Sequence, residues 1–202
     1  MLELPTTTYF GKIIAKDKIY EQVGADKSLR DLFVAQVERI RWLYKISQET
    51  TSIAKGDSVS EIQFIEVSLN VEKPDNRILT AILKAVPYKI VFVLVFNKCE
   101  SYEIFYDSKI HFSSSNPPKL SGTNMNAAWD NIVVQVGGVE TVDGRTLDEQ
   151  IAFDQEQLRL KEKIAKLETQ ARKEKQPRRK WNLHEEIKKL KLQQLNGSSD
   201  NA

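Results

Sequence analysis

The sequence predicts an α+β protein: a small, mostly antiparallel sheet covered by helices on one side, followed by a C-terminal helical hairpin or coiled-coil appendage. β-branched and aromatic residues are concentrated in three short runs, at 61–71, 88–96 and 101–107, as is typical of strands. Apolar residues recur at helical spacing between these runs. The chain after Gly144 is instead dominated by charged residues and Gln, which separates an appendage from the folded core.

The N-terminal part of the chain predicts two helices. A short helix covers residues 17–23, and Ser28 is a suitable N-cap for a second helix. The second helix is expected over residues 28–46, because apolar residues follow one helical stripe there: Leu29, Phe33, Val37, Ile40 and Tyr44. Trp42 lies off this stripe, and we expect it to pack beneath the N-terminal segment.

The central part of the chain predicts the sheet. Residues 61–71 alternate between apolar and polar side chains, and residues 88–96 are apolar on both faces, as in a central strand. A tight connection at Asn97 and Lys98 leads into the strand at 101–107, so the pair forms a hairpin. A helix over 74–86 lies between the first two strands. A Ser- and Pro-rich loop at 113–122 precedes another helix over 124–136.

The C-terminal part reads as two charged helices joined by a basic turn. The predicted domains are 1–138 for the α+β unit, 139–146 for a linker, 147–196 for the hairpin and 197–202 for a disordered tail. In the first helix the seam positions alternate in steps of four and three: Phe153, Gln157, Leu160, Ile164, Leu167 and Ala171. The second helix carries Leu183, Ile187 and Leu190. Two helices alone bury little surface, so we expect the leucines and isoleucines of both helices to bind a partner. These residues are Leu160, Ile164, Leu167, Leu183, Ile187 and Leu190.

Composition narrows the functional classes. The net charge of +2 is too small for the whole chain to be a general polyanion binder. The lone cysteine, Cys99, cannot form an internal disulfide, which favours a reducing compartment. The sequence offers neither a membrane span nor a basic leader before an apolar run, so we expect a cytoplasmic protein.

No residue pattern predicts an enzyme, a cofactor or a metal. His111 and His184 lack a partner at a familiar spacing, and no glycine-rich phosphate loop follows a strand. A divergent metal-dependent nuclease would need converging carboxylates, for which Glu61 and Glu66 are the candidates. These residues are five apart on one strand and should therefore face opposite sides of the sheet.

The basic turn at 172–181 is open to several interpretations. Six basic residues surround a single acid: Arg172, Lys173, Lys175, Arg178, Arg179 and Lys180. Arg178, Arg179 and Lys180 could contact nucleic-acid phosphates while Trp181 stacks on a base. The turn could instead dock a protein, or form a solvated tip in which Trp181 packs back and Asn182 caps the last helix.

Several stretches together resemble an uncharacterised bacterial family, a domain of unknown function. They are KIYEQV at 18–23, LFVAQVERIRWLYKIS at 32–47, EIQFIEVSLN at 61–70, VPYKIVFVLVF at 86–96, GTNMNAAWDNIVVQVGG at 122–138 and EKQPRRKWNLHEEIKKLK at 174–191. The resemblance implies gene neighbours that encode helicases and DNA methyltransferases in defence or restriction-like loci. It supplies no catalytic residue. The chain departs from the family between Tyr106 and Gly122, where a longer aromatic insert is usual.

These observations favour a non-catalytic accessory or adaptor protein, a subunit of a bacterial phage-defence or restriction-like system. It would dock a protein partner, a helicase or DNA methyltransferase, through its C-terminal helices. A nucleic-acid-binding module that uses the basic turn is the first alternative, and a divergent nuclease is the second. A homodimer is also compatible with the apolar seam.

Overall fold

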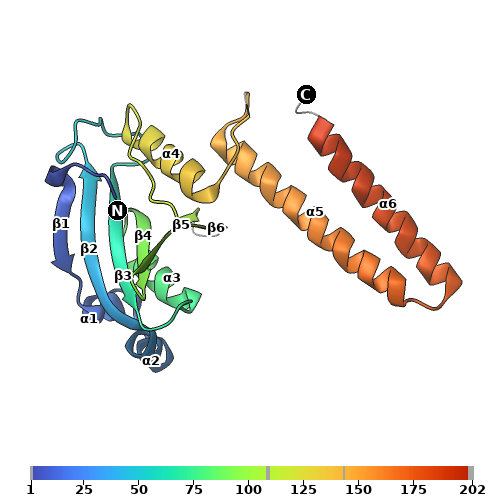
Figure 1. Cartoon of the computed structure of the whole chain (residues 1–202), viewed down its shortest axis with the longest axis horizontal. Helices are drawn as coiled ribbons and strands as arrows, with labels where there is room; N and C mark the ends of the chain where they lie inside the picture. The colour runs from blue at the N-terminus through green and yellow to red at the C-terminus, as the bar shows by residue number, and fades with distance from the viewer. Residues whose placement is uncertain (1, 108–109, 143, 200–202) are drawn as a thin grey trace. The chain divides into compact units, whose positions relative to one another are not determined.

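The computed structural model describes residues 2–107, 110–142 and 144–199, with only the backbone at 196–199. The chain divides into two compact units, one ending at Gly138 and one beginning at Val139. Figure 1 shows the sheet and its helices in the first unit and two long helices in the second. No helix among these residues is long and apolar enough to cross a bilayer.

The first unit is built on a six-stranded sheet whose strands lie in sequence order, β1 to β6. The strands are β1 (Tyr9–Ile13), β2 (Val37–Ser47), β3 (Glu61–Leu69), β4 (Lys89–Phe96), β5 (Cys99–Tyr106) and β6 (Ile110–Ser114). All neighbouring pairs are antiparallel except β3 and β4, which helix α3 (Asn76–Ala85) connects. The predicted α+β class with a mostly antiparallel sheet is therefore confirmed.

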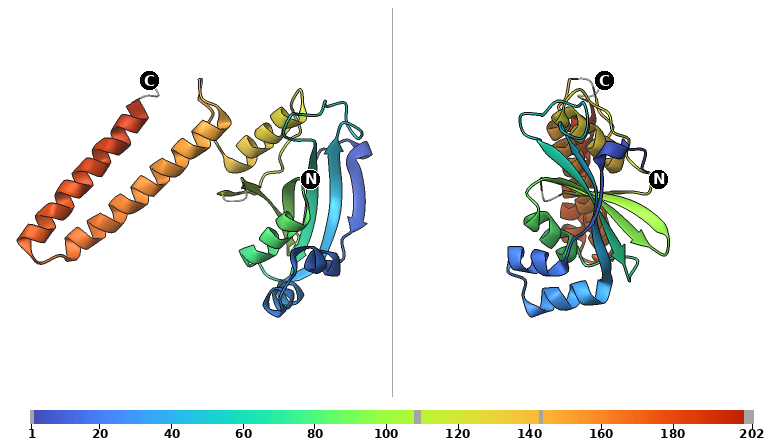
Figure 2. Two further views of the ribbon diagram at one scale, coloured as in Figure 1. Left: turned by 180° about the vertical axis from the view of Figure 1, so that it is seen from behind. Right: turned by 90° about the vertical axis from the view of Figure 1, so that its left-hand side faces the viewer.

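Helices cover both faces of the sheet, so the expected one-sided arrangement is wrong. Helices α1 (Lys16–Val23), α2 (Lys27–Gln36) and α3 bury one core with Ile90 and Phe92 of β4 (Figure 2). Lys89 points to the other face because successive strand side chains alternate. Its ammonium lies 5.4 Å from the ring centre of Trp129 in α4 (Met125–Gly137), which places α4 on that second face.

The predicted helix over 28–46 is wrong beyond Gln36, where α2 ends and β2 begins. The buried positions of β2 recur every three residues, at Val37, Ile40, Leu43 and Ile46. Register shifts between Val37 and Arg39 and between Trp42 and Tyr44 reset the alternation of the strand, so its spacing imitates a helical stripe. Trp42 is therefore a strand residue, and it stacks on Phe10 of β1, 4.5 Å between ring centres, as expected from the N-terminal segment.

Other elements agree with the sequence more closely. The strand at 88–96 and the helices at 74–86 and 124–136 appear as β4, α3 and α4. Asn97 and Lys98 form a two-residue turn in which both φ angles are positive, at 49° and 66°, which suits the twist of the β4–β5 hairpin. Strands β1 and β6 are short edge strands that the sequence did not predict.

The second unit contains two helices, α5 (Leu147–Lys173) and α6 (Pro177–Ser199). Thr146 begins α5 with a capping box: the Glu149 N–H donates to the Thr146 hydroxyl, and the Thr146 N–H donates to the Glu149 carboxylate. α6 begins at Pro177, so the expectation that Asn182 caps the last helix is wrong. α6 extends past residue 196, and residues 200–202 of the expected tail lie outside the described residues.

Candidate functional site

The seam residues of the hairpin lie between its two helices. Ile164 and Ala171 of α5 form a buried cluster with Ile187 of α6. Leu167, Leu183 and Leu190 pack against this cluster, and Leu160 is also buried. The structure thus brings five of the six sequence-predicted docking residues into one contact inside the chain, and their apolar surface is largely used by the hairpin itself.

Two ion pairs flank this seam. The Lys163 ammonium lies 3.2 Å from the Glu186 carboxylate, and the Lys191 ammonium lies 2.7 Å from the Glu168 carboxylate. The hydrogen bond from Lys191 lowers the pKa of Glu168. All four side chains are well exposed, so each pair contributes little stability.

The outer surface of α6 carries large apolar side chains, of which the sequence analysis named Trp181 and missed Leu192 and Leu195. Trp181, Leu192 and Leu195 are 65%, 52% and 62% exposed. Leu192 and Leu195 follow Trp181 by 11 and 14 residues. Because each residue turns the helix by about 100°, both side chains point within about 40° of the direction of Trp181 around the helix axis. We call these three residues the outer stripe; Glu185 and Lys188 lie in nearly the same direction between Trp181 and Leu192, so its apolar side chains are separated by polar ones. The sequence could have indicated this stripe through the spacing of positions 181, 192 and 195. The more regular spacing of Leu183, Ile187 and Leu190 drew attention to the opposite side of the helix.

The basic residues of the predicted turn are distributed over the tip of the hairpin. Arg172 and Lys173 end α5, Lys175 lies in the connection, and Arg178–Lys180 belong to the first turn of α6. All six side chains are exposed, and no ion pair involves them within the described part of the chain. Trp181 does not pack back on the hairpin, because two-thirds of its surface is exposed, so the solvated-tip interpretation is wrong on this point.

A groove runs beside the tip between the two helices. It encloses about 440 Å³, and Ala171 and Ile187 of the seam lie in its lining. The polar part of the lining contains Arg172, Lys180, His184, Lys191 and a single acid, Glu168. A second, more open hollow of about 750 Å³ is lined by Lys173, Lys175 and Arg179 together with Glu174 and Glu186. Positive charge is therefore in greater excess in the first groove.

The candidate nuclease carboxylates are each engaged by a cation of the neighbouring strand. The Arg41 guanidinium donates two hydrogen bonds to Glu66, at 2.8 Å and 2.5 Å, and this contact raises the pKa of Arg41. Glu66 is buried, and Arg39 approaches it to 3.8 Å. Arg41 and Glu66 are directly opposite each other in the register of β2 and β3. The Glu66 carboxylate is therefore held in an ion pair between the two strands and is not free to act as a base.

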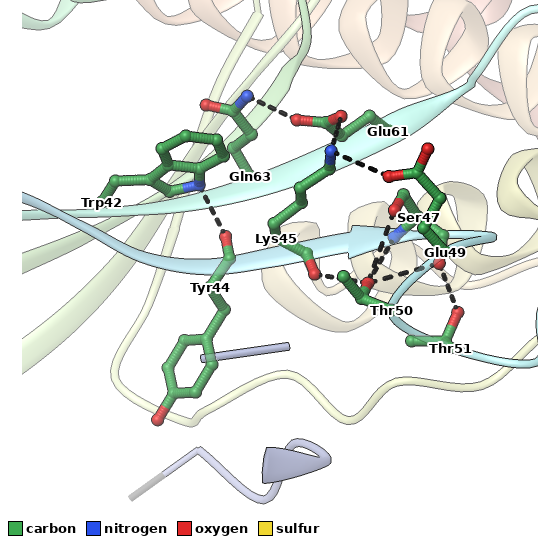
Figure 3. Close-up of polar contacts among 9 residues, drawn as sticks. All are labelled: Trp42, Tyr44, Lys45, Ser47, Glu49, Thr50, Thr51, Glu61 and Gln63. Carbon is green, nitrogen blue, oxygen red and sulfur yellow. Dashed lines mark hydrogen bonds and ion pairs between the residues drawn. The ribbon is translucent and has the colours of Figure 1, made fainter. Parts of the chain in front are cut away.

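Glu61 belongs to a separate polar cluster, drawn in Figure 3. Its carboxylate accepts a 2.6 Å hydrogen bond from the Gln63 amide and lies 3.2 Å from the Lys45 ammonium, which also approaches Glu49. Burial alone would lower the pKa of Lys45, but the hydrogen bond and charge of Glu61 outweigh it and raise that pKa. Glu61 also lines a cavity of about 560 Å³ with Tyr88 and Asp107, yet both of its oxygens already have partners.

The remaining reactive side chains do not converge. His111 contacts Glu103 at 2.7 Å and stacks on Phe105, while Cys99 is exposed on β5. Across the described ranges, no group of three or more His, Cys, Asp or Glu side chains is arranged to hold a metal ion.

A family model described as a domain of unknown function, DUF4391, matches residues 2–194. The match spans nearly the whole chain, so the chain belongs to this family. No curated protein and no solved structure matches the chain.

Proposed function

We propose that this DUF4391 protein is a non-catalytic accessory protein that docks a partner protein through the outer stripe of α6. The single observation that supports this proposal most strongly is the exposure of Trp181, Leu192 and Leu195 on one side of a helix whose other side is already packed. A helix that docks on another protein presents apolar anchors spaced along one side, and these three side chains have that arrangement.

The small core of the hairpin supports the same conclusion. Three side chains, Ile164, Ala171 and Ile187, are buried in its central cluster, although α5 and α6 span 27 and 23 residues. Such long helices are stabilised mostly by packing, and a two-helix contact buries only one stripe of each. A third element against the outer stripe would supply the missing burial.

Charge favours a partner of different sequence over a second copy of this chain. Helix α6 contains six Lys and Arg residues but only two acidic residues, Glu185 and Glu186. Two copies joined through this helix would bring like charges together, whereas an acidic rim on a different protein would be complementary. A helicase or DNA methyltransferase of a bacterial defence system is the partner class we propose, as the family resemblance implies.

The nuclease alternative has no comparable support. Glu61 and Glu66 have different cationic partners, Lys45 and Arg41, and the ion pairs account for their burial. The proposed accessory role therefore assigns no catalytic residue and no cofactor.

The test compares Leu192→Glu with the neighbouring control Gln193→Glu. Binding of the full-length chain to the purified helicase or DNA methyltransferase encoded beside its gene is measured by calorimetry. We expect Leu192→Glu to weaken binding about ten-fold or more, because a buried Leu contact worth about 1.5 kcal/mol is replaced by a charge. The control should stay within about two-fold, since Gln193 is exposed and points about 100° away.

Two results would overturn the proposal. Equal binding by both variants would place the interface elsewhere. Sedimentation that shows a dimer of the wild-type chain, dissociated by Leu192→Glu, would assign the outer stripe to self-association.

A further inference from the structure

We propose that the hairpin tip is a single-stranded nucleic-acid site, in which the groove beside Arg172 and Lys180 holds phosphates and Trp181 stacks on an unpaired base. This inference shares Trp181 with the protein-docking proposal, but it otherwise depends on the cations of the tip rather than on Leu192 and Leu195.

The first support is uncompensated charge. The tip has six basic residues between positions 172 and 180 and one acid, Glu174. Two partly buried cations of the sheet have acidic partners, as Arg41 has Glu66 and Lys45 has Glu61. The tip cations have no such ion pairs among the described residues. A surface of this kind attracts a polyanion and releases its counterions on binding.

The second support is the shape of the surface. Arg172 comes from the end of α5 and Lys180 from the start of α6, yet both line the same groove of about 440 Å³. His184 and Lys191 line it from further along α6, so the hydrogen-bond donors of the groove are spread along that helix rather than gathered at one point. Its acid, Glu168, is occupied by Lys191 at 2.7 Å. The groove therefore fits successive phosphates of an extended backbone better than one isolated anion.

The third support selects a single strand over a duplex. Trp181 directly follows Lys180, and 65% of its surface is exposed. An exposed indole beside a phosphate groove can stack on an unpaired base of any sequence, whereas the bases of a duplex are already stacked on one another. Trp181 also lies at the end of the outer stripe nearest the tip, so one partner complex could engage both surfaces.

The experiment measures the fluorescence anisotropy of a labelled oligothymidylate of about 20 nucleotides with the full-length chain. The double variant R172Q/K180Q is compared with K161Q/K166Q, which removes the same charge from exposed positions of α5 away from the tip. We expect the tip variant to lose about ten-fold or more in affinity and its salt slope to fall by about 1.4, since each lost single-strand contact contributes about 0.7. The control variant should keep the salt slope of the wild type.

A second pair of variants tests stacking. Trp181→Ala should weaken binding about five- to ten-fold without changing the salt slope, and Trp181→Phe should restore most of the affinity. Leu192→Glu should leave oligonucleotide binding in place, so loss of protein docking and loss of nucleic-acid binding are separate results. Circular dichroism confirms that each variant keeps its helices.

The inference is overturned if the wild-type chain does not bind the oligonucleotide at about 50 mM salt. It is also overturned if both charge variants lose affinity equally, or if a duplex binds as tightly and Trp181→Ala has no effect. Binding to phosphatidylserine vesicles with no binding to the oligonucleotide would assign the tip to a membrane surface instead.

Discussion

Replacing Ile187 by alanine tests the assignment of inner and outer surfaces in the hairpin. Ile187 is 6% exposed and packs with Ile164 and Ala171, so the substitution removes three buried carbon atoms from a very small core. At about 0.8 kcal/mol for each carbon, the transfer cost is about 2.4 kcal/mol, and a partly collapsed cavity can raise it to about 3.5 kcal/mol.

The measurement is native-state hydrogen exchange of the α5 and α6 amides. A loss of 2.4–3.5 kcal/mol, as an order-of-magnitude estimate, lowers protection by about 60- to 350-fold wherever exchange requires opening of the hairpin. The matched control is Leu192→Ala, which removes similar atoms from a side chain that is 52% exposed and should change protection by less than about three-fold.

Equal loss of protection in the two variants would refute the reasoning, because it would mean that Leu192 is as buried as Ile187. Unchanged protection in Ile187→Ala would show that the seam does not hold the two helices together.

Three other perturbations should have measurable effects. Arg41→Ala leaves the buried Glu66 carboxylate with the Ser68 hydroxyl at 3.3 Å and Arg39 at 3.8 Å. We expect urea denaturation to show a loss of about 2–3 kcal/mol, with a smaller loss when Glu66→Gln is added. Thr146→Ala removes the capping box of α5 and should reduce the protection of its first turn by about 1 kcal/mol, measured by exchange. The pKa values of Glu149 and Glu168 are lowered from 4.5, by the hydrogen bond from the Thr146 backbone and by the one from Lys191 respectively. As the pH falls, the carboxyls of the unfolded chain bind protons before those of the folded chain. The stabilisation of the folded hairpin by the two ionised carboxylates is therefore complete above about pH 4.5 and is lost as the pH falls through their pKa values in the folded state. Circular dichroism should show this as a loss of helicity at low pH, and the loss should be smaller in Glu149→Gln.

The spacing of apolar residues predicted most of the helices and strands whose buried positions recur regularly along the element. The strand at 88–96 is apolar on both faces because it lies inside the sheet, and the seam of α5 repeats in steps of four and three because one helix packs along it. β2 misled the same reasoning. Its two register shifts place Val37, Ile40 and Leu43 on buried positions three residues apart, a spacing that a helix also produces. The short edge strands β1 and β6 have too few residues for any period to appear.

By itself, the sequence determined that a folded α+β unit precedes a charged pair of helices, that those helices carry a continuous apolar seam, and that basic residues gather where they join. These features depend on composition and on spacing within one element. Only the tertiary structure decided that α6 covers the seam of α5, that Trp181, Leu192 and Leu195 consequently face outward, and that Glu61 and Glu66 are matched by Lys45 and Arg41. The physical reason is that packing partners and strand register join residues far apart in the chain, and no local periodicity records which of them meet.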